Sequence, residues 1–364
     1  MSKIKICHVV SGLVGGGVEE MLYNYCSNID MDKFDMHILY QHSASEKNYK
    51  QFKSLNFTLN EIPYKVKHPL KNFKSTYKYL KENKFDIIHC HMTLMNFIPL
   101  ICAKILKVKV RICHSHNYDG RKKNFIVKFG EYILKKICIS CSTDLFACGE
   151  KAGEYLYGKK KFTIIHNAIC LEKYEFDKIK RNEIRKKLDI NDNEIVLGNI
   201  GRLTEQKNQK FLLEILKKLK DKNKYKLIII GDGKLKDELN KQAIEYKINS
   251  DIIFTGIISN VQDYYNSFDV FLLPSLWEGL PVTSIEAQAN GLKCLFSNNL
   301  DNSLIIDNKK TKTLKLDVME WIDEIKKINK NYQRKIDLKK FNEKKYNVKV
   351  EAKKLEEFYT RKVL

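Results

Sequence analysis

Two pairs of charged residues in the second half of the chain have types and spacings suited to ligand binding. Glu278 and Glu286 stand eight positions apart, across a loop and the expected start of a helix. Arg202 and Lys207 stand five positions apart, after an expected strand. Carboxylates accept hydrogen bonds from hydroxyls, whereas an arginine with a lysine suits a diphosphate. A nucleotide sugar presents both kinds of group, so the two pairs together indicate a ligand of that class.

Each pair also has an ordinary structural explanation when it is considered alone. The chain contains 66 lysines and arginines, so two solvated cations near one another are unremarkable in it. Acidic residues at the start of a helix are favoured by the helix dipole, which would account for Glu286. The sequence around both pairs, described below, favours the binding interpretation.

A glycine-rich segment, Gly12-Leu13-Val14-Gly15-Gly16-Gly17, follows the first expected strand and opens a helix. Glycines let the backbone approach a phosphate or a sugar closely, and helix N-terminal amides favour anions. The spacing is not that of G-x-G-x-x-G, so the dinucleotide-binding fingerprint is not met. A tight strand-to-helix turn is the alternative interpretation.

Two histidine clusters, His89-Cys90-His91 and His114-Ser115-His116-Asn117, lie just past expected strands. We expect the histidines of each cluster to point to opposite faces of the sheet, which makes a shared metal doubtful. Two clusters at adjacent strand ends nevertheless favour a site. Asp30-Met31-Asp32 supplies fewer oxygen ligands than a magnesium or manganese site needs. We therefore expect no metal and no other cofactor.

Strand-like and helix-like segments alternate along the chain in two series, and the second series starts at residue 194. This alternation predicts an α/β fold with two parallel, doubly wound sheets, joined by a polar linker around residues 168–193. We expect an N-terminal domain over residues 1–170, a C-terminal domain over 178–340, and a last helix within 341–364. Ligands bind beyond the carboxyl ends of the strands in such sheets, where the motifs above lie, apart from Asp30-Met31-Asp32.

Composition narrows the class of protein. A length of 364 residues suits two domains, and the 43% of hydrophobic residues allows ample burial. A helix that spans a membrane is not expected, because every apolar stretch is too short. The ten cysteines lie mostly in apolar segments, which favours reduced thiols that pack in a cytoplasmic protein's core.

The net charge of +22 is larger in the first half, where residues 1–170 contain 27 basic and 14 acidic residues, than in the rest, which contains 39 and 30. Within the first half, residues 121–136 interleave Arg121, Lys122, Lys123, Lys128, Lys135 and Lys136 with apolar side chains. A basic amphipathic helix can lie on anionic lipid, although a helix with one wet and one buried face is the alternative. We favour the membrane surface slightly. Nucleic-acid binding is disfavoured, because charge alone is a weak indication without a binding motif.

Several segments resemble retaining glycosyltransferase family 4. The segment from Leu273 to Gly291, which contains both glutamates, is similar to the family's E-x7-E signature. Further similarities follow the family's order at Gly15-Gly16-Gly17-Val18-Glu19, His91, Gly201-Arg202-Leu203, Gln206-Lys207-Asn208, Gly231-Asp232-Gly233 and Phe254-Thr255-Gly256. The segment His114–Asn117 resembles the branch that builds capsular and exopolysaccharides. The chain departs from the family at Ala168, where a glycine is frequent, and in the asparagine-rich region after Ser297.

This resemblance implies the GT-B architecture, with two facing Rossmann-like domains and a final helix that crosses back to the first domain. It implies catalytic roles for His91, Arg202, Lys207 and Glu278, and acceptor-side roles for Gly15, His91, His114, His116 and Asn117. It implies that the donor is bound by Gly16, Gly17, Arg202, Lys207, Gly231, Gly233, Gly256, Glu278, Gly279, Leu280, Pro281 and Glu286. Arg202 and Lys207 would hold the diphosphate, Glu278 the sugar hydroxyls and Glu286 the ribose.

The function that follows is metal-independent, retaining transfer of a hexose or N-acetylhexosamine from a UDP-type sugar to a lipid-linked saccharide. We expect the enzyme in the cytoplasm, peripheral at the inner face of the membrane. A glycolipid or a protein-linked glycan is the alternative acceptor. A retaining phosphorylase or an epimerase of the same architecture is the rival enzyme, and a basic nucleic-acid binder is the rival without catalysis.

Overall fold

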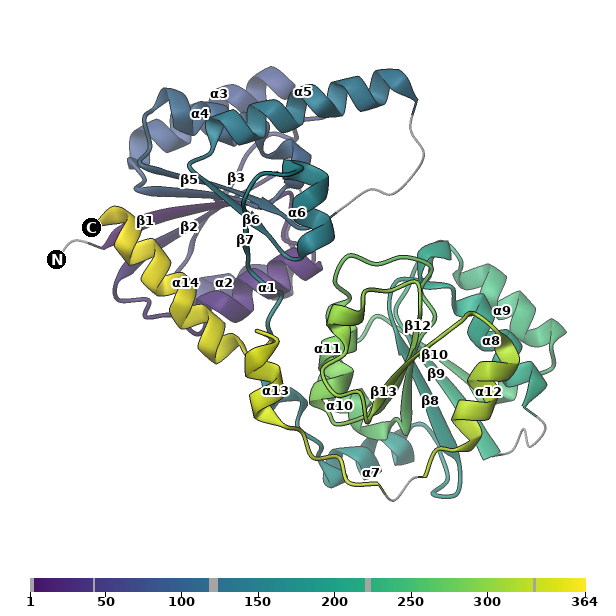
Figure 1. The fold of residues 1–364 in the computed structure, drawn as a ribbon. Helices are drawn as coiled ribbons and strands as arrows, with labels where there is room; N and C mark the ends of the chain where they lie inside the picture. Colours follow the sequence, from purple (N-terminus) through teal and green to yellow (C-terminus); the bar gives the residue numbers. More distant parts are fainter. Residues whose placement is uncertain (1–2, 42, 118–123, 220–223, 330–331) are drawn as a thin grey trace. The chain divides into compact units, whose positions relative to one another are not determined.

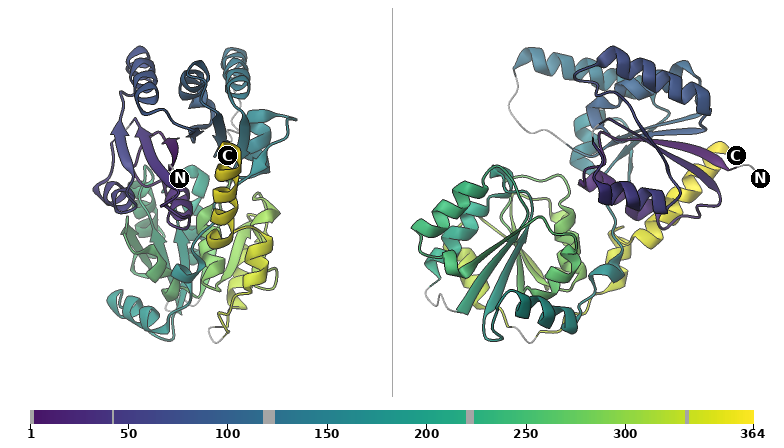
Figure 2. Two further views of the ribbon diagram at one scale, coloured as in Figure 1. Left: turned by 90° about the vertical axis from the view of Figure 1, so that its left-hand side faces the viewer. Right: turned by 180° about the vertical axis from the view of Figure 1, so that it is seen from behind.

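The computed structural model describes residues 3–41, 43–117, 124–219, 224–329 and 332–364. The chain divides into two compact units, each built around one parallel sheet (Figures 1 and 2). Unit 1 comprises Met1–Ile169 with Lys345–Leu364, and unit 2 comprises Cys170–Lys344. The expectation of two doubly wound α/β domains is confirmed.

The sheet of unit 1 has the strand order β3-β2-β1-β4-β5-β6-β7, and its strands pair in parallel. The order reverses between β1 and β4, which is the position where ligands bind in doubly wound sheets. The strands are β1 (Ile4–Val9), β2 (Phe34–Tyr40), β3 (Thr58–Glu61), β4 (Ile87–Cys90), β5 (Val110–Ser115), β6 (Asp144–Ala147) and β7 (Thr163–Ile164).

Helices cover both faces of this sheet, so its central strands are buried on both sides. One face packs against α3, α4 and α5, and the other against α1, α2 and α14 (Figure 1). The helices are α1 (Gly17–Cys26), α2 (Glu46–Ser54), α3 (Pro69–Asn83), α4 (Phe97–Ile105), α5 (Phe125–Cys141), α6 (Glu150–Tyr157) and α14 (Val348–Val363), with a 3-10 turn, η1 (Thr93–Asn96). The last helix thus belongs to unit 1, as the family resemblance implies.

Unit 2 repeats this plan with the strand order β10-β9-β8-β11-β12-β13, again in parallel. The order reverses between β8 and β11. The strands are β8 (Ile195–Ile200), β9 (Tyr225–Ile230), β10 (Ile252–Gly256), β11 (Val270–Leu273), β12 (Lys293–Ser297) and β13 (Thr311–Leu314). The helices and 3-10 turns used below are η2 (Leu171–Tyr174), α7 (Lys178–Lys187), η3 (Glu205–Lys207), α8 (Gln209–Lys218), α9 (Lys236–Glu245), α10 (Val261–Ser267), α11 (Val282–Ala289), α12 (Val318–Lys326) and α13 (Leu338–Glu343).

Helix α7 lies in the segment expected to be a linker. Its sequence lacks an apolar stripe, and two arginines attach it to the unit instead. Arg181 Nη2 and Arg185 Nη1 lie 2.6 and 3.3 Å from the carboxylate oxygens of the buried Asp269. Asp177 caps its start by accepting from the amides of Ile179 and Lys180. Hydrophobic periodicity cannot detect a helix that is held by charge pairs.

The sequence expectations also omit α2, β3 and α6 in unit 1 and β13 and α12 in unit 2. The asparagine-rich region after Ser297 leads into β13, which continues the sheet beside β12. One last helix was expected within residues 341–364, but the structure places the end of one helix and the whole of another there. Helix α13 ends at Glu343, and Asn347 caps the start of α14.

All ten cysteines are free, and nine of them are buried. Cys7, Cys90, Cys102 and Cys113 belong to one hydrophobic cluster between the sheet of unit 1 and helices α3 and α4. Their expected role as small core residues is therefore confirmed.

Candidate functional site

The loops after β8 and β11 meet at the point where the strand order of unit 2 reverses. The amide of Leu276 donates to Gln206 O at 2.9 Å, and Gln206 Nε2 donates to Trp277 O at the same distance. Asn208 Nδ2 donates to Pro274 O at 3.2 Å. These bonds bring Lys207 and Glu278, which are far apart in sequence, to one place. We call this place the β8–β11 junction.

Lys207 and Glu278 form an ion pair at the junction. Lys207 Nζ lies 2.6 Å from Glu278 Oε1, which is within the distance of an ion pair. The two atoms do not have the geometry of a hydrogen bond. Gln206 Nε2 donates to the other carboxylate oxygen at 3.3 Å. Both charged side chains are largely buried, which strengthens their mutual attraction. The residues expected at the diphosphate and at the sugar therefore hold each other in place.

Arg202 differs from Lys207 in its surroundings. It is exposed, and its guanidinium has neither an ion pair nor a hydrogen bond to another residue in the described part of the chain. Its carbonyl accepts from Gln209 Nε2 at 3.1 Å, which fixes the backbone at the end of β8. The guanidinium fork is thus free to take an anionic ligand.

Glycines allow the strand ends of unit 2 to lie against one another. Gly231 has a φ of +137°, and a Cβ atom there would overlap the carbonyl oxygen of Gly201. A Cβ atom on Gly233 would lie 2.5 Å from Leu203 O. The amide of Gly231 also donates to Gly256 O at 3.0 Å. Gly231 and Gly233 are needed for this close packing, whatever they contribute to donor binding.

Glu286 lies on α11 and is almost fully buried. Its Oε1 accepts from the Tyr174 hydroxyl at 2.8 Å, and its Oε2 accepts from the Tyr265 hydroxyl at 2.6 Å. Burial, and secondarily the neighbouring carboxylate, raise the pKa of Tyr265 well above its usual value. The sequence analysis missed both tyrosines, because no linear spacing links them to the glutamate.

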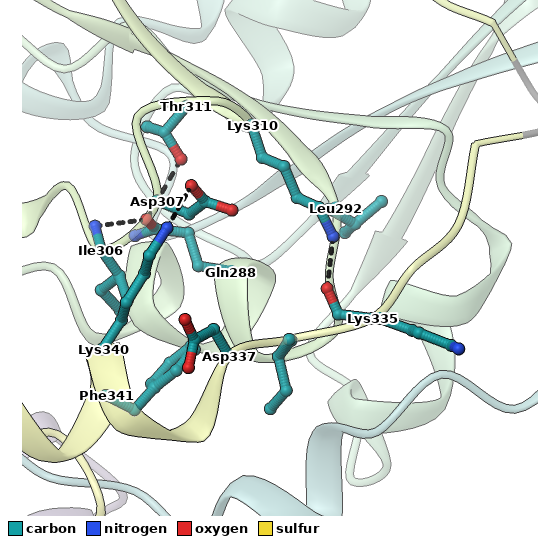
Figure 3. A pocket seen from close by; sticks show the side chains of 11 residues that line it. Gln288, Leu292, Ile306, Asp307, Lys310, Thr311, Lys335, Asp337, Lys340 and Phe341 are labelled. Atoms are coloured by element: carbon teal, nitrogen blue, oxygen red, sulfur yellow. Dashed lines mark hydrogen bonds and ion pairs between the residues drawn. The ribbon is translucent and has the colours of Figure 1, made fainter.

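A small pocket in unit 2 explains how α11 is anchored (Figure 3). Gln288 Oε1 accepts from the amide of Ile306 at 2.8 Å and from Thr311 Oγ1 at 3.1 Å. Lys340 Nζ lies 2.9 Å from Asp307 Oδ1 across the same pocket. With about 10 Å³ the pocket holds one water molecule at most. It is a structural joint that fixes the helix carrying Glu286.

In unit 1 the glycine-rich segment leads into α1. Gly15 has a φ of +94°, a conformation that favours glycine. The amide of Gly16 donates to Glu19 Oε2 at 2.8 Å, so a carboxylate of the protein itself occupies the helix N-terminus. Burial raises the pKa of Glu19. Gly17 has open space around it. A phosphate that bound the Gly16 amide would have to displace Glu19.

A groove of about 380 Å³ lies beside the reversal point of unit 1 and is lined by His91 and Asn117, two of the expected acceptor-side residues. It is also lined by Lys65, which the sequence analysis missed. Burial lowers the pKa of Lys65 to about 8. Lys65 Nζ lies 3.4 Å from Met92 Sδ. A lysine in a partly dry groove suits an anionic ligand.

The expectation that His89 and His91 face opposite sides of the sheet is wrong. Residues two apart on a strand share a face. The rings of His89 and His91 stack with their centroids 4.1 Å apart, and those of His114 and His116 lie 4.0 Å apart. The doubt about a shared metal, which rested on that expectation, therefore falls.

Both ring nitrogens of His91 are engaged by other histidines. Nε2 lies 3.1 Å from His8 Nδ1, and Nδ1 lies 3.0 Å from His116 Nε2. Burial lowers the pKa of His91 well below its usual value. The ring is therefore neutral at pH 7 and fixed in orientation beside the groove.

Comparisons with known proteins show the family of the chain and its fold. The family model described as "Glycosyltransferase Family 4" matches residues 15–173, and "Glycosyl transferases group 1" matches residues 180–348. EpsF of Bacillus subtilis, which carries glycosyltransferase in its name, is 30% identical over 82% of this chain and 80% of its own length.

Two further similarities concern a sequence and a fold. An Escherichia coli enzyme named "UDP-Gal:alpha-D-GlcNAc-diphosphoundecaprenol alpha-1,3-galactosyltransferase" is 27% identical over 85% of this chain and 83% of its own length. The structure of Anabaena HepE in complex with UDP and glucose has a TM-score of 0.74 at 13% identity, and the match covers 99% of this chain and 95% of HepE. This structural likeness shows the fold.

Proposed function

The chain belongs to glycosyltransferase family 4, and we propose that this glycosyltransferase moves a hexose or N-acetylhexosamine from a UDP sugar to a lipid-linked saccharide. We further propose that it acts in surface polysaccharide biosynthesis and retains the anomeric configuration. The name of the Escherichia coli relative, which pairs a UDP sugar with a diphosphoundecaprenol acceptor, supports this choice of donor and acceptor.

The observation that carries the proposal is the β8–β11 junction, where an unpaired arginine precedes a buried ion pair. As the bond to the sugar breaks, negative charge develops on the leaving diphosphate. Arg202 would bind that diphosphate, and Lys207, held by Glu278, would stabilise the developing charge. Charge that is already in position is usually the largest single contribution to catalysis. In this scheme neither Asp30-Met31-Asp32 nor a metal ion takes part in the transfer step.

The carboxylates of unit 2 would orient the donor. Glu278 would accept from sugar hydroxyls while it remains paired with Lys207. Glu286, fixed by Tyr174 and Tyr265, would accept from the ribose hydroxyls. A carboxylate oxygen can accept more than one hydrogen bond, so the tyrosines do not exclude the ribose. The loop Gly279-Leu280-Pro281 would contact the donor sugar through its backbone.

The groove of unit 1 would receive the acceptor. Lys65 supplies a positive charge that suits the phosphates of a lipid-linked saccharide. His91 and Asn117 line the same groove. We assign the acceptor side to these residues, with His116, which contacts the His91 ring, and with His114 beside it.

We also propose that unit 1 lies on the inner face of the cytoplasmic membrane through α5. Phe125 and Ile126, at the start of this helix, are 81% and 79% exposed, and Phe129 is also exposed. Lys128 lies among them on the same helix. Apolar side chains next to a basic residue suit an anionic lipid surface. The expected basic residues Arg121, Lys122 and Lys123 lie outside the described residues.

Replacement of the unpaired arginine tests the proposed function. In an assay with UDP-hexoses and undecaprenyl-diphosphate saccharides, Arg202→Ala should reduce kcat about 100–1,000-fold, the usual effect of losing one charge-stabilising group. Arg361→Ala on α14, another exposed arginine, is the matched control and should transfer normally. Normal transfer by a folded Arg202→Ala enzyme would show that the diphosphate assignment is wrong.

The product distinguishes this proposal from its rivals. NMR of the glycoside should show the donor's anomeric configuration, as a retaining enzyme requires. Incubation with the UDP sugar alone should give little free UDP. An epimerised nucleotide sugar in that incubation would favour the epimerase instead. Transfer to a glycolipid or a protein-linked glycan in preference to the undecaprenyl acceptor would overturn the acceptor assignment alone.

A further inference from the structure

Five buried histidines gather on one face of the sheet of unit 1. His8, His89 and His114 come from the neighbouring strands β1, β4 and β5, and His91 and His116 follow β4 and β5. None of the five is more than 6% exposed. The residues that alternate with them, such as Cys7 and Cys90, face the opposite layer of helices. We call these five residues the histidine cluster.

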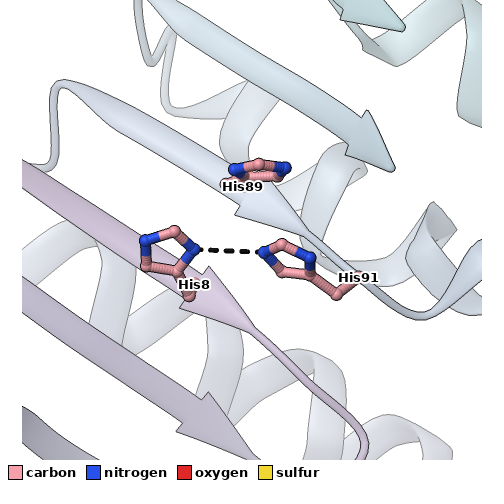
Figure 4. Close-up of side chains that lie close together, drawn as sticks. All are labelled: His8, His89 and His91. Atoms are coloured by element: carbon pink, nitrogen blue, oxygen red, sulfur yellow. Dashed lines mark hydrogen bonds between the residues drawn. The ribbon is translucent and has the colours of Figure 1, made fainter. Parts of the chain in front are cut away.

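The ring nitrogens of the cluster approach one another closely. His8 Nδ1 lies 3.1 Å from His91 Nε2, and His91 Nδ1 lies 3.0 Å from His116 Nε2 (Figure 4 shows the first contact). His89 Nε2 lies 3.1 Å from His114 Nδ1. Two nitrogen ligands of a tetrahedral zinc ion lie about 3.3 Å apart, given Zn–N bonds of about 2.0–2.1 Å. The 3.0 Å between His91 Nδ1 and His116 Nε2 is therefore close to the spacing of two metal ligands, whereas the other two contacts suit hydrogen bonds between ring nitrogens.

Three nitrogens of the cluster are buried without a hydrogen-bond partner in the described part of the chain: His8 Nε2, His114 Nε2 and His116 Nδ1. A buried polar atom without a partner costs free energy, so native proteins rarely leave three together. Two of these three nitrogens belong to His114 and His116. An ion bound by His114 Nε2 would provide the missing interaction at that nitrogen.

We propose that His91, His114 and His116 bind one zinc-type ion in unit 1. One ring nitrogen of each of these residues lies within 4.8 Å of the others. Imidazole suits zinc and related transition metals, and a set of three histidines leaves one tetrahedral position open. His91 and His116 are the two most exposed members of the cluster, and His91 also lines the groove. They give the ion a route, of which the deeper trio of His8, His89 and His91 shares only His91, because His8 and His89 are at most 1% exposed.

The other two histidines of the cluster, His8 and His89, are placed to accept hydrogen bonds from the proposed ligands. Metal-bound histidines almost always donate their other ring N–H to an acceptor. His91 Nε2 can donate to His8 Nδ1, and His114 Nδ1 can donate to His89 Nε2. His89 Nδ1 in turn lies 2.7 Å from the Tyr359 hydroxyl on α14. These contacts give two of the three proposed ligands a partner that fixes the ring.

The protonation state of the cluster agrees with metal binding. Burial lowers the pKa of His116 to about 3 and lowers the pKa values of His91 and His114 well below the usual value. The three rings are therefore neutral at pH 7, and neutral imidazole is the form that binds metals. An ion would consequently bind without releasing protons.

Direct metal binding tests the proposal without an activity assay. The tag-free full chain, treated with EDTA and kept reduced, is titrated with Zn²⁺ against a chromophoric chelator. We expect one tight site per chain. His114→Gln and His116→Gln should weaken it more than the roughly 10–100-fold loss that removal of an outer partner causes. His89→Gln should fall within that range, because it removes the partner of His114.

His37→Gln is the matched control, because His37 is a buried strand histidine of the same sheet outside the cluster. It should bind Zn²⁺ like the parent protein. Absence of a tight site would overturn the proposal, as would Zn²⁺ binding that survives both His114→Gln and His116→Gln. Loss of the site in His8→Gln but not in His116→Gln would assign the ion to the deeper trio and would also overturn it.

A spectrum of the unmodified protein keeps the proposal testable if a variant fails to fold. Co²⁺ added in place of Zn²⁺ should give the visible bands of a tetrahedral ion with nitrogen ligands. Strong near-ultraviolet thiolate absorption would place the ion at cysteines and contradict the proposal. Unfolding temperatures of all variants in EDTA identify those that are folded.

Discussion

At the scale of single residues, charge and partner decide what each side chain of the β8–β11 junction can do. Arg202 has no charge partner among the described residues, whereas Lys207 lies 2.6 Å from Glu278. An unpaired guanidinium can take a ligand without breaking a contact. A paired lysine stabilises developing charge only while its carboxylate partner keeps it in place. We therefore propose different roles for the two cations, which were expected to act alike.

A prediction at this scale concerns the ion pair. Lys207→Met should destabilise the protein by about 3–5 kcal/mol, because it leaves Glu278 buried without its counter-charge. The double variant Lys207→Met with Glu278→Gln should lose less than this single variant, since no unpaired charge remains. Urea unfolding of the parent, both single variants and the double variant measures the effects. Additive losses would show that the two side chains do not stabilise each other.

At the scale of elements, close approach of strand ends depends on residues without side chains. The loops after β8 and β9 touch at Gly201 and Gly231, and a Cβ atom on Gly231 has no room. The same dependence on β geometry gathers the histidine cluster. Residues at every second position of three adjacent strands share one face, so a sequence that alternates histidine with cysteine builds a histidine face and a cysteine face.

Two glycines give a matched prediction about elements. Gly231→Ala should destabilise unit 2 by more than about 1 kcal/mol, because it adds an overlap to a positive φ. Gly130→Ala, in the interior of α5 with open space around it, should stabilise the protein by roughly 0.5–1 kcal/mol. Thermal unfolding of both variants measures the difference. A lower unfolding temperature in both variants would contradict this account.

The histidine cluster predicts how stability depends on pH. Burial holds the pKa values of its members below 6.5, to about 3 for His8 and His116. Below pH 6.5 the unfolded chain therefore binds protons that the folded chain cannot bind. Stability should be complete above that pH and should fall by about 1.4 kcal/mol per pH unit for each histidine as the pH decreases.

Urea unfolding in EDTA at pH 7.5, 6.5 and 5.5 checks this dependence. His116→Gln should reduce the slope of the free energy of unfolding against pH by the contribution of one histidine, even if it also changes the stability at pH 7.5. A free energy of unfolding that stays constant between pH 7.5 and 5.5 would show that the cluster is protonated in the folded protein.

At the scale of the whole molecule, the net charge and the exposed apolar side chains are the features that bear on membrane binding. The chain carries a net charge of +22. Within the described residues, no helix combines the length and the apolar composition that crossing a bilayer requires. The contact with lipid that we propose is the exposed surface of α5.

Vesicle flotation tests that surface. The protein should float with vesicles that contain anionic phosphatidylglycerol and should dissociate as salt rises, because surface charge is screened. Phe125→Ser with Ile126→Ser should reduce binding, since it removes the most exposed apolar side chains of α5. Ile244→Ser, at an exposed apolar residue of α9 in unit 2, is the control. Equal flotation of all variants would exclude α5 as the membrane contact.

The sequence alone determined the fold class and most of the elements. Alternating apolar segments predicted two parallel sheets, because a strand buried on both faces needs a continuous apolar run. The segment from Leu273 to Gly291 and the residues around Arg202 identified the family. The shared face of the histidines was also contained in the sequence, since strand geometry repeats every two residues. Our expectation wrongly placed residues two positions apart on opposite faces.

Only the tertiary structure decided which of these residues meet. Strands β8 and β11 are neighbours although β9 and β10 separate them in sequence, so the contact between Lys207 and Glu278 follows from sheet order. The tyrosines around Glu286, the groove with Lys65 and the helix α7 are likewise non-local. Local patterns report the preference of each segment for helix or strand. Partners across the fold are selected by packing and by the pairing of buried charge, which no single segment contains.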